Sequence, residues 1–257
     1  MVTLLNLLKI SIIILKSKKK VYTYEKRRDT MRVLIIIPAY NEENSLYNLV
    51  NDIKFNYKEC DILIVNDCSS DNTKKLKFDH NVKRIDLPVN LGIGGAVQTG
   101  YKYAYDNGYD IAIQVDGDGQ HNASYLRDLV DEINKGYNLC LGSRYIENEG
   151  FQSTALRRVG IKYFSNLIKV VSGELITDPT SGFRACDKEV IKIFATKYPQ
   201  DYPEPETLVL VKKKGLKIKE IPVVMNEREH GVSSINFKKS IYYMIKVSLA
   251  VCLASDK

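Results

Sequence analysis

The chain has 257 residues but no tryptophan, only three histidines and only five cysteines. No two cysteines have the Cys-x-x-Cys spacing of structural zinc sites, and their odd number argues against a framework of disulfide bonds. We therefore expect reduced thiols, as in a cytoplasmic protein, with several of them packed in the core. The five cysteines are Cys60, Cys68, Cys140, Cys186 and Cys252.

A long apolar segment is also missing near the N-terminus. The apolar stretch over residues 4–15 is interrupted by Lys9 and is shorter than the ~20 residues that span a bilayer. It lacks the leading basic region and the small-residue cleavage site of a signal peptide. With Lys18-Lys19-Lys20 behind it, this stretch could lie at the cytoplasmic face of a membrane. We favour the simpler interpretation that residues 1–30 are an extension outside the fold.

The folded body carries little excess charge. Residues 1–30 hold eight lysines and arginines against two acids, so most of the formal net charge of +7 lies there. A nucleic-acid-binding domain usually has its basic excess on the folded body. The charge distribution therefore argues against a nucleic-acid partner.

From residue 31 onward, apolar runs alternate with helical patterns. Continuous apolar strands between helices are typical of an α/β fold with a mostly parallel central sheet and helices on both faces. The expected strands cover residues 33–37, 62–65, 82–87, 111–115 and 139–142, and the expected helices cover residues 42–55, 92–107 and 126–135.

After Ser143 the pattern becomes less regular. We predict one domain over residues 31–235 and a C-terminal amphipathic helix within residues 236–257. This helix either packs on the core or offers Lys238, Lys239 and Lys246 to lipid headgroups. The other expectations are helices over 155–171, 190–195, 207–214 and 235–253, an irregular stretch over 177–184, a loop over 198–205 and an outer strand over 216–224.

Carboxylates follow three of the expected strands. Asp116 and Asp118 lie one residue apart directly after the strand at 111–115, and glycines allow the chain to turn tightly there. Such close like charges repel unless a cation lies between them, and their oxygens suit Mg²⁺ or Mn²⁺. Glu42 and Asp67 follow the first and second strands, so a parallel sheet would place all four acids at one edge. Each acid alone could be a helix cap, but together they predict a metal and nucleotide site.

A glycine-rich stretch, Asn90-Leu91-Gly92-Ile93-Gly94, opens the helix at 92–107. It is similar to a dinucleotide-binding fingerprint, but it follows the third strand rather than the first. We prefer a turn at Gly92 and Gly94 that lets the backbone approach a nucleotide, with amide contacts from Asn90.

Taken together, these motifs resemble those of family 2 inverting glycosyltransferases, most closely the dolichol-phosphate mannose synthase-like subgroup, over about residues 32–245. The resemblance implies a GT-A fold in which a nucleotide-binding half precedes an acceptor-binding half. It also implies a UDP- or GDP-linked sugar donor and a polyprenyl-phosphate or glycan acceptor. Asn122 departs from the proline that lipid-phosphate sugar synthases often have there. The implied roles are base and ribose binding by Pro38, Ala39, Tyr40, Glu42 and Asp67, ribose and metal contact by Asp116, and metal ligation by Asp118 and Gln120.

The C-terminal half supplies the acceptor candidates. The stretch from Asp178 to Arg184 resembles the family's second signature, and Arg184 could contact a phosphate. Glu206 is our candidate base for a hydroxyl acceptor and Glu204 the alternative, although either could only cap a helix. Arg228, Ser233 and Ser234 match a further element that could receive a phosphate. Two other functions stay open, a sugar nucleotidyltransferase and a non-catalytic nucleotide-sugar-binding protein.

Overall fold

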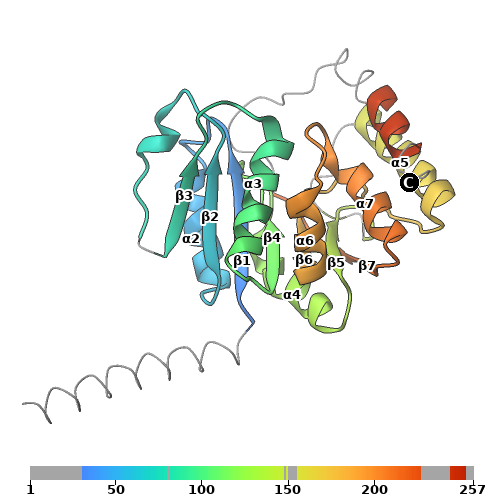
Figure 1. Ribbon diagram of the computed structural model, residues 1–257, viewed down its shortest axis with the longest axis horizontal. Coiled ribbons are helices and arrows are strands. Elements are labelled where there is room, and N and C mark those ends of the chain that lie inside the picture. The colour runs from blue at the N-terminus through green and yellow to red at the C-terminus, as the bar shows by residue number, and fades with distance from the viewer. Residues whose placement is uncertain (1–30, 80, 148, 150–154, 227–243, 253–257) are drawn as a thin grey trace, which may run out of the picture. The chain divides into compact units, whose positions relative to one another are not determined.

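The computed structural model describes residues 31–79, 81–147, 149, 155–226 and 244–252 (Figure 1). Within them, a seven-stranded sheet has the order β3-β2-β1-β4-β6-β5-β7. The predicted α/β fold with a mostly parallel sheet is confirmed. The strands are β1 (Val33–Ala39), β2 (Asp61–Asn66), β3 (Val82–Asp86), β4 (Ile111–Gln114), β5 (Leu139–Ser143), β6 (Arg184–Asp187) and β7 (Ile218–Pro222).

The centre of the sheet places three predicted strand ends side by side. β1 lies between β2 and β4 and runs parallel to both, with Ile36 opposite Leu63 on one side and Gln114 on the other. Because parallel strands end at the same edge of a sheet, the residues that follow β1, β2 and β4 emerge together.

Helices cover both faces of this sheet. α3 and α6 lie on one face, and α2 and α4 lie on the other (Figure 1). Alternate residues of β1 point to opposite faces of the sheet. Ile36 packs with α3, whereas Ile35 and Ile37 pack with α2. Each of these isoleucines is fully buried, which contributes roughly 1.5–3 kcal/mol. The helices are α2 (Leu46–Asn56), α3 (Gly92–Asp106), α4 (Leu126–Asn134), α5 (Ala155–Ser172), α6 (Lys188–Thr196) and α7 (Pro203–Lys213), with short 3₁₀ turns η1 (Asn72–Lys75) and η2 (Ala123–Tyr125).

The C-terminal half differs from the expectations at two points. Residues 177–183 are irregular as expected, but β6, which starts at Arg184 and runs antiparallel between β4 and β5, was not predicted. The loop expected over residues 198–205 ends early, because α7 begins at Pro203. Proline is tolerated in the first turn of a helix, where its missing N–H is not needed.

The predicted C-terminal helix is only partly described. Residues 244–252 are helical, and Val247 and Val251 are buried in the same core as α3 and α6. Residues 1–30 and 227–243 lie outside the described residues, so the predicted N-terminal extension and the predicted domain end at 235 stay predictions. In the described part of the chain, no helix combines the length and apolar character needed to cross a membrane.

Candidate active site

The turn after β4 packs directly against the chain that leaves β1. The Ser45 hydroxyl lies 2.8 Å from the Glu42 carboxylate and 2.7 Å from the Gly117 carbonyl. A Cβ atom on Gly117 would lie 3.0 Å from the Pro38 carbonyl oxygen, so only glycine fits easily here. The structure thus brings Glu42 and the Asp116–Asp118 turn together, as the sequence predicted.

The chain that leaves β1 is also tied to the chain that leaves β2. The Glu42 N–H donates to the Thr73 hydroxyl at 2.9 Å, and the Asn41 carboxamide oxygen accepts from the Ser70 N–H at 2.8 Å. Pro38 and Ala39 are buried beneath these loops, whereas Tyr40 is exposed beside them. Tyr40 is therefore accessible to a ligand, and its predicted contact with a base stays a prediction.

Asp67 directly follows β2 and holds the glycine-rich turn. Its Oδ1 accepts from the Leu91 N–H at 2.7 Å, and its carbonyl oxygen accepts from the Asn90 amide at 3.2 Å. Burial raises the pKa of the Asp67 carboxyl, although the N–H groups of Leu91 and Gly92 oppose this shift. The Asn90 carboxamide oxygen accepts from the Gly92 N–H at 3.1 Å, so the amide first stabilises the turn itself. The predicted contact of Asn90 with a nucleotide stays a prediction.

The start of α3 meets the segment that leads into α7. Gly94 donates its N–H to the Gln200 carbonyl at 3.0 Å. A Cβ atom on Gly94 would lie 2.1 Å from the Pro199 carbonyl oxygen, so the two backbones can meet only at a glycine. Gly92 has a φ of +75°, which glycine adopts without strain. The glycine-rich turn therefore joins the predicted nucleotide-binding half to the predicted acceptor-binding half.

The metal candidates lie on the turn between β4 and η2. The Asp116 side chain is about a third exposed, at 36%, and the Asp118 carboxylate accepts from the Gln120 N–H at 3.1 Å. No group of three His, Cys, Asp or Glu residues within the described ranges could hold a metal alone. Mg²⁺ and similar ions usually bind one or two carboxylates together with substrate phosphates. Two carboxylates on one turn meet this requirement in number, and their binding of a cation stays a prediction.

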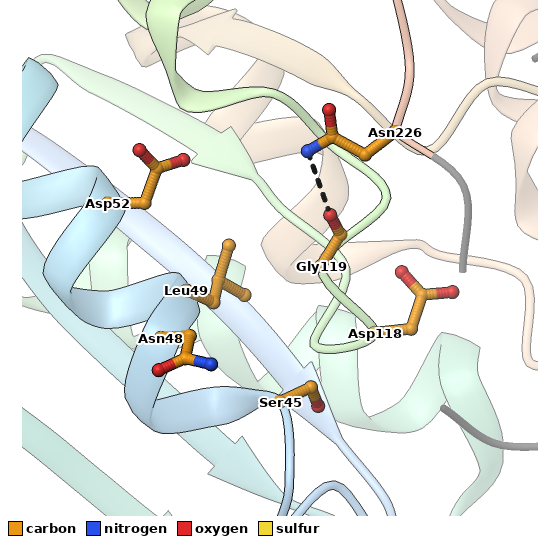
Figure 2. A pocket seen from close by; sticks show the side chains of 7 residues that line it. All are labelled: Ser45, Asn48, Leu49, Asp52, Asp118, Gly119 and Asn226. Carbon is orange, nitrogen blue, oxygen red and sulfur yellow. Dashed lines mark hydrogen bonds between the residues drawn. The ribbon is translucent and has the colours of Figure 1, made fainter. Parts of the chain in front are cut away.

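A segment that is distant in the sequence also supports this turn. Asn226, which follows β7, donates its amide to the Gly119 carbonyl at 3.3 Å and its N–H to the Gln120 carbonyl at 2.9 Å. Figure 2 shows the cleft between this turn and α2, with the Asp118 carboxylate pointing away from α2. The cleft holds about 160 Å³, less than the ~300 Å³ of a small ligand site, so by itself it is too small for a nucleotide-sugar.

Asp178 was expected to contact a ligand, but the structure places it inside the protein. It is fully buried and accepts two hydrogen bonds from the Arg144 guanidinium, at 2.7 and 2.8 Å. Burial alone would lower the pKa of Arg144, but the bonds and charge of Asp178 raise it above its ordinary value. Sequence reasoning missed Arg144, although its position directly after β5, at the edge where β4 also ends, was a usable signal.

Glu220 on β7 was also missed. Its carboxylate accepts from the Thr177 N–H at 2.7 Å, the Asp178 N–H at 2.9 Å and the Thr177 hydroxyl at 3.0 Å. Burial raises the pKa of Glu220, and these N–H donors oppose the shift. Glu220 thereby fixes the segment that carries Asp178.

The structure contradicts the expected phosphate contact of Arg184. Its guanidinium is fully buried and donates to the Thr207 hydroxyl at 2.9 Å and to the Ser181 carbonyl at 3.2 Å. The side chain therefore links β6 to α7 inside the protein and does not reach a ligand.

The candidate bases lie in the first turn of α7. Glu206 is partly buried, and burial raises the pKa of its carboxyl, while the positive charges of Lys197 and Lys246 lower it. A raised pKa suits a general base, so Glu206 stays a candidate with Glu204 as the alternative. Arg228, Ser233 and Ser234 lie outside the described residues, and their roles stay predictions.

Comparison with known proteins gives the family. Residues 34–194 match the glycosyl transferase family 2 domain. The chain belongs to this family. It is 34% identical over 222 residues to the UDP-N-acetylglucosamine–dolichyl-phosphate N-acetylglucosaminyltransferase of Methanococcus voltae, a match that covers 78% of this chain and 88% of that protein. It is 28% identical over 231 residues to the polyprenol monophosphomannose synthase of Mycolicibacterium smegmatis, covering 86% of this chain and 87% of the relative.

The solved structures support the fold of this family 2 glycosyltransferase. Glucosyl-3-phosphoglycerate synthase from Mycobacterium tuberculosis, in complex with Mn²⁺, UDP and phosphoglyceric acid, superposes with a TM-score of 0.65. The match covers 89% of this chain and 79% of the synthase, at 17% sequence identity. The expected GT-A fold is confirmed.

Proposed function

We propose that this family 2 enzyme transfers a sugar from a UDP-linked donor to a polyprenyl phosphate, with inversion at the anomeric carbon. The observation that carries the proposal is the meeting of the Glu42, Asp67 and Asp116 segments at one sheet edge. The Methanococcus voltae relative is named for a UDP-sugar donor and a dolichyl-phosphate acceptor, which supports both choices. A GDP-linked donor and a glycan acceptor are the alternatives.

The strand-end residues would bind the donor. Asp116, Asp118 and Gln120 would hold Mg²⁺ or Mn²⁺, which when bound offsets the negative charge of the departing nucleoside diphosphate. The nucleoside would lie over the ends of β1 and β2. The residues in contact with its base and ribose would be Pro38, Ala39, Tyr40, Glu42 and Asp67, with backbone of the Gly92–Gly94 turn close by.

The acceptor decides whether a base is needed. A polyprenyl phosphate is already anionic, so its oxygen can attack the anomeric carbon without losing a proton to Glu206 or Glu204. A sugar hydroxyl must lose its proton, and then a carboxylate at one of these positions would be essential. Arg228, Ser233 and Ser234 are the proposed phosphate contacts in the acceptor-binding half.

We also propose contact with the cytoplasmic face of a membrane, where a lipid acceptor would be found. The exposed face of α5 combines Val159 and Val170, which are 66% and 84% exposed, with Lys162 and Lys169. α5 contains no acidic residue, so this face suits an anionic lipid surface.

The predicted C-terminal helix lies beside α5 in its described part, and this supports the same contact. The Tyr163 hydroxyl of α5 lies 3.0 Å from the Ser248 hydroxyl, and Ile245 and Leu249 are exposed next to this junction.

A transfer assay tests the proposal. The full chain is incubated with Mn²⁺, undecaprenyl phosphate in detergent micelles and radiolabelled UDP-N-acetylglucosamine, UDP-glucose or GDP-mannose. We expect label in the lipid phase with a UDP-sugar, and its loss with EDTA or in Asp118→Asn. Transfer from GDP-mannose alone contradicts the donor, and transfer only to a glycan contradicts the acceptor. If no donor releases its nucleoside diphosphate, a non-catalytic sugar-nucleotide-binding protein is the better interpretation.

A further inference from the structure

The Asp116 carboxylate has a buried nitrogen on each side. The Gln114 amide donates to Oδ1 at 3.0 Å, and the Nε2 of His121 lies 3.6 Å from Oδ2. Gln114 is fully buried and His121 is nearly so. The two oxygens of one partly exposed acid are thus oriented by two side chains that water scarcely reaches.

The His121 ring has a defined orientation. Its Nδ1 accepts a hydrogen bond from the Asp116 backbone N–H at 3.0 Å. A neutral ring that accepts at Nδ1 must carry its proton on Nε2, so an N–H group is directed at the Asp116 carboxylate. At 3.6 Å this contact is longer than a hydrogen bond, and its attraction is that of a dipole near a charge. Contacts of this kind often shorten when a site binds its ligand.

Packing holds the ring in place. His121 stacks on Phe183 with ring centres 4.8 Å apart and planes 16° from parallel. Phe183 is fully buried, and a Cβ atom on the preceding Gly182 would lie 2.8 Å from Oδ2 of Asp116. The segment before β6 therefore passes directly beside the carboxylate, which stays partly exposed to solvent.

The polar contacts of Gln114 indicate why a polar side chain stands at this buried position. Its carboxamide oxygen is buried and has no hydrogen-bond partner among the described residues. A buried amide with an unpaired oxygen costs stability relative to an apolar side chain of the same shape. Among the described residues, the side chain of Gln114 hydrogen-bonds to Asp116, and this contact explains why a polar residue is tolerated here.

We infer that His121 and Gln114 are positioning residues that set the orientation of Asp116 toward the cation and the donor diphosphate. This inference rests on the proposed function, because it assigns Asp116 to the metal site. In metal sites generally, loss of a group that orients a ligand weakens metal affinity by about 10–100-fold. The alternative is that both side chains merely fill the core.

Two variants separate these interpretations. His121→Asn keeps an oxygen near the Nδ1 position, so the Asp116 N–H retains an acceptor while the carboxylate loses its neighbour. Gln114→Met keeps the shape of the side chain, removes the donor to Oδ1 and removes the unpaired oxygen. The matched control is Asn122→Ala, which removes the cap on the Ser124 N–H in the next turn and leaves the contacts of Asp116 intact.

The measurement is free Mn²⁺ by electron paramagnetic resonance, in the presence of UDP, with the full chain and no acceptor. We expect about 10–100-fold weaker Mn²⁺ binding for His121→Asn and Gln114→Met, and unchanged binding for Asn122→Ala. Gln114→Met should keep or raise the midpoint of thermal unfolding while it weakens Mn²⁺ binding, a combination that loss of packing cannot produce. Unchanged Mn²⁺ affinity in both variants overturns the inference and leaves the proposed function standing. If the wild-type chain binds no Mn²⁺ with UDP, the metal assignment and the inference both fall.

Discussion

The buried pair of Arg144 and Asp178 gives the sharpest stability prediction. Asp178→Ala leaves the Arg144 guanidinium inside the protein without its two short bonds. Removing one partner of a buried ion pair costs about 3–5 kcal/mol, because the other charge stays buried and uncompensated. In a protein of this size, a loss of that magnitude should lower the unfolding midpoint by roughly 6–20 °C.

A second substitution tests the reason for this loss. Replacing both partners, with Arg144→Met and Asp178→Leu together, should be far less destabilising than Asp178→Ala, because no charge stays buried. The control is Glu59→Ala, which removes an exposed partner of Arg127. Exposed ion pairs contribute about 0–1 kcal/mol to stability, so the unfolding midpoint of this control variant should hardly change.

Calorimetry and urea titration of these variants measure the effect. A loss below about 1 kcal/mol for Asp178→Ala refutes the reasoning, because it puts the buried pair in the range of exposed ones. A double variant as unstable as Asp178→Ala would show that packing, not the unpaired charge, is responsible.

Three further predictions concern activity and binding. Gly94→Ala forces a Cβ atom to within 2.1 Å of the Pro199 carbonyl oxygen, so the turn must shift, and we expect a higher KM for the donor and a lower unfolding midpoint. Glu206→Gln should retain turnover if the acceptor is a polyprenyl phosphate. If the acceptor is instead a hydroxyl, the variant should be inactive. In that case the rate of the wild-type enzyme should fall as the pH drops through the raised pKa of Glu206. Val170→Asp on the exposed face of α5 should reduce sedimentation with phosphatidylglycerol vesicles, and unchanged sedimentation would exclude this face from membrane contact.

Much of the donor half could be predicted from the sequence. β1, β2 and β4 are apolar runs that end in short polar motifs, and parallel order alone brings those motifs to one edge. The adjacency of Glu42 and Gly117 follows from local patterns plus this one rule of topology.

The acceptor half could not be predicted as well. The burial of Arg184 depends on Thr207, 23 residues away in the sequence, and a charged side chain after Gly182-Phe183 resembles a surface turn. Glu220 acts on Thr177 across 43 residues, and nothing beside it in the sequence marks the contact. Contacts that depend on tertiary packing produce no periodic pattern in the sequence, so the sequence does not predict them.

The reversed direction of β6 determines which part of the chain lies beside Asp116. A strand that runs antiparallel to its neighbours begins at the edge where they end, so the chain that enters β6 after α5 arrives beside the end of β4. The stretch that leads into β6 lies beside Asp116 at Gly182. It is separate from β1, β2 and the glycine-rich turn. Residues 177–183 are held in place through Asp178 by Arg144 and through Thr177 by Glu220, so these two contacts also fix the backbone that lies beside Asp116.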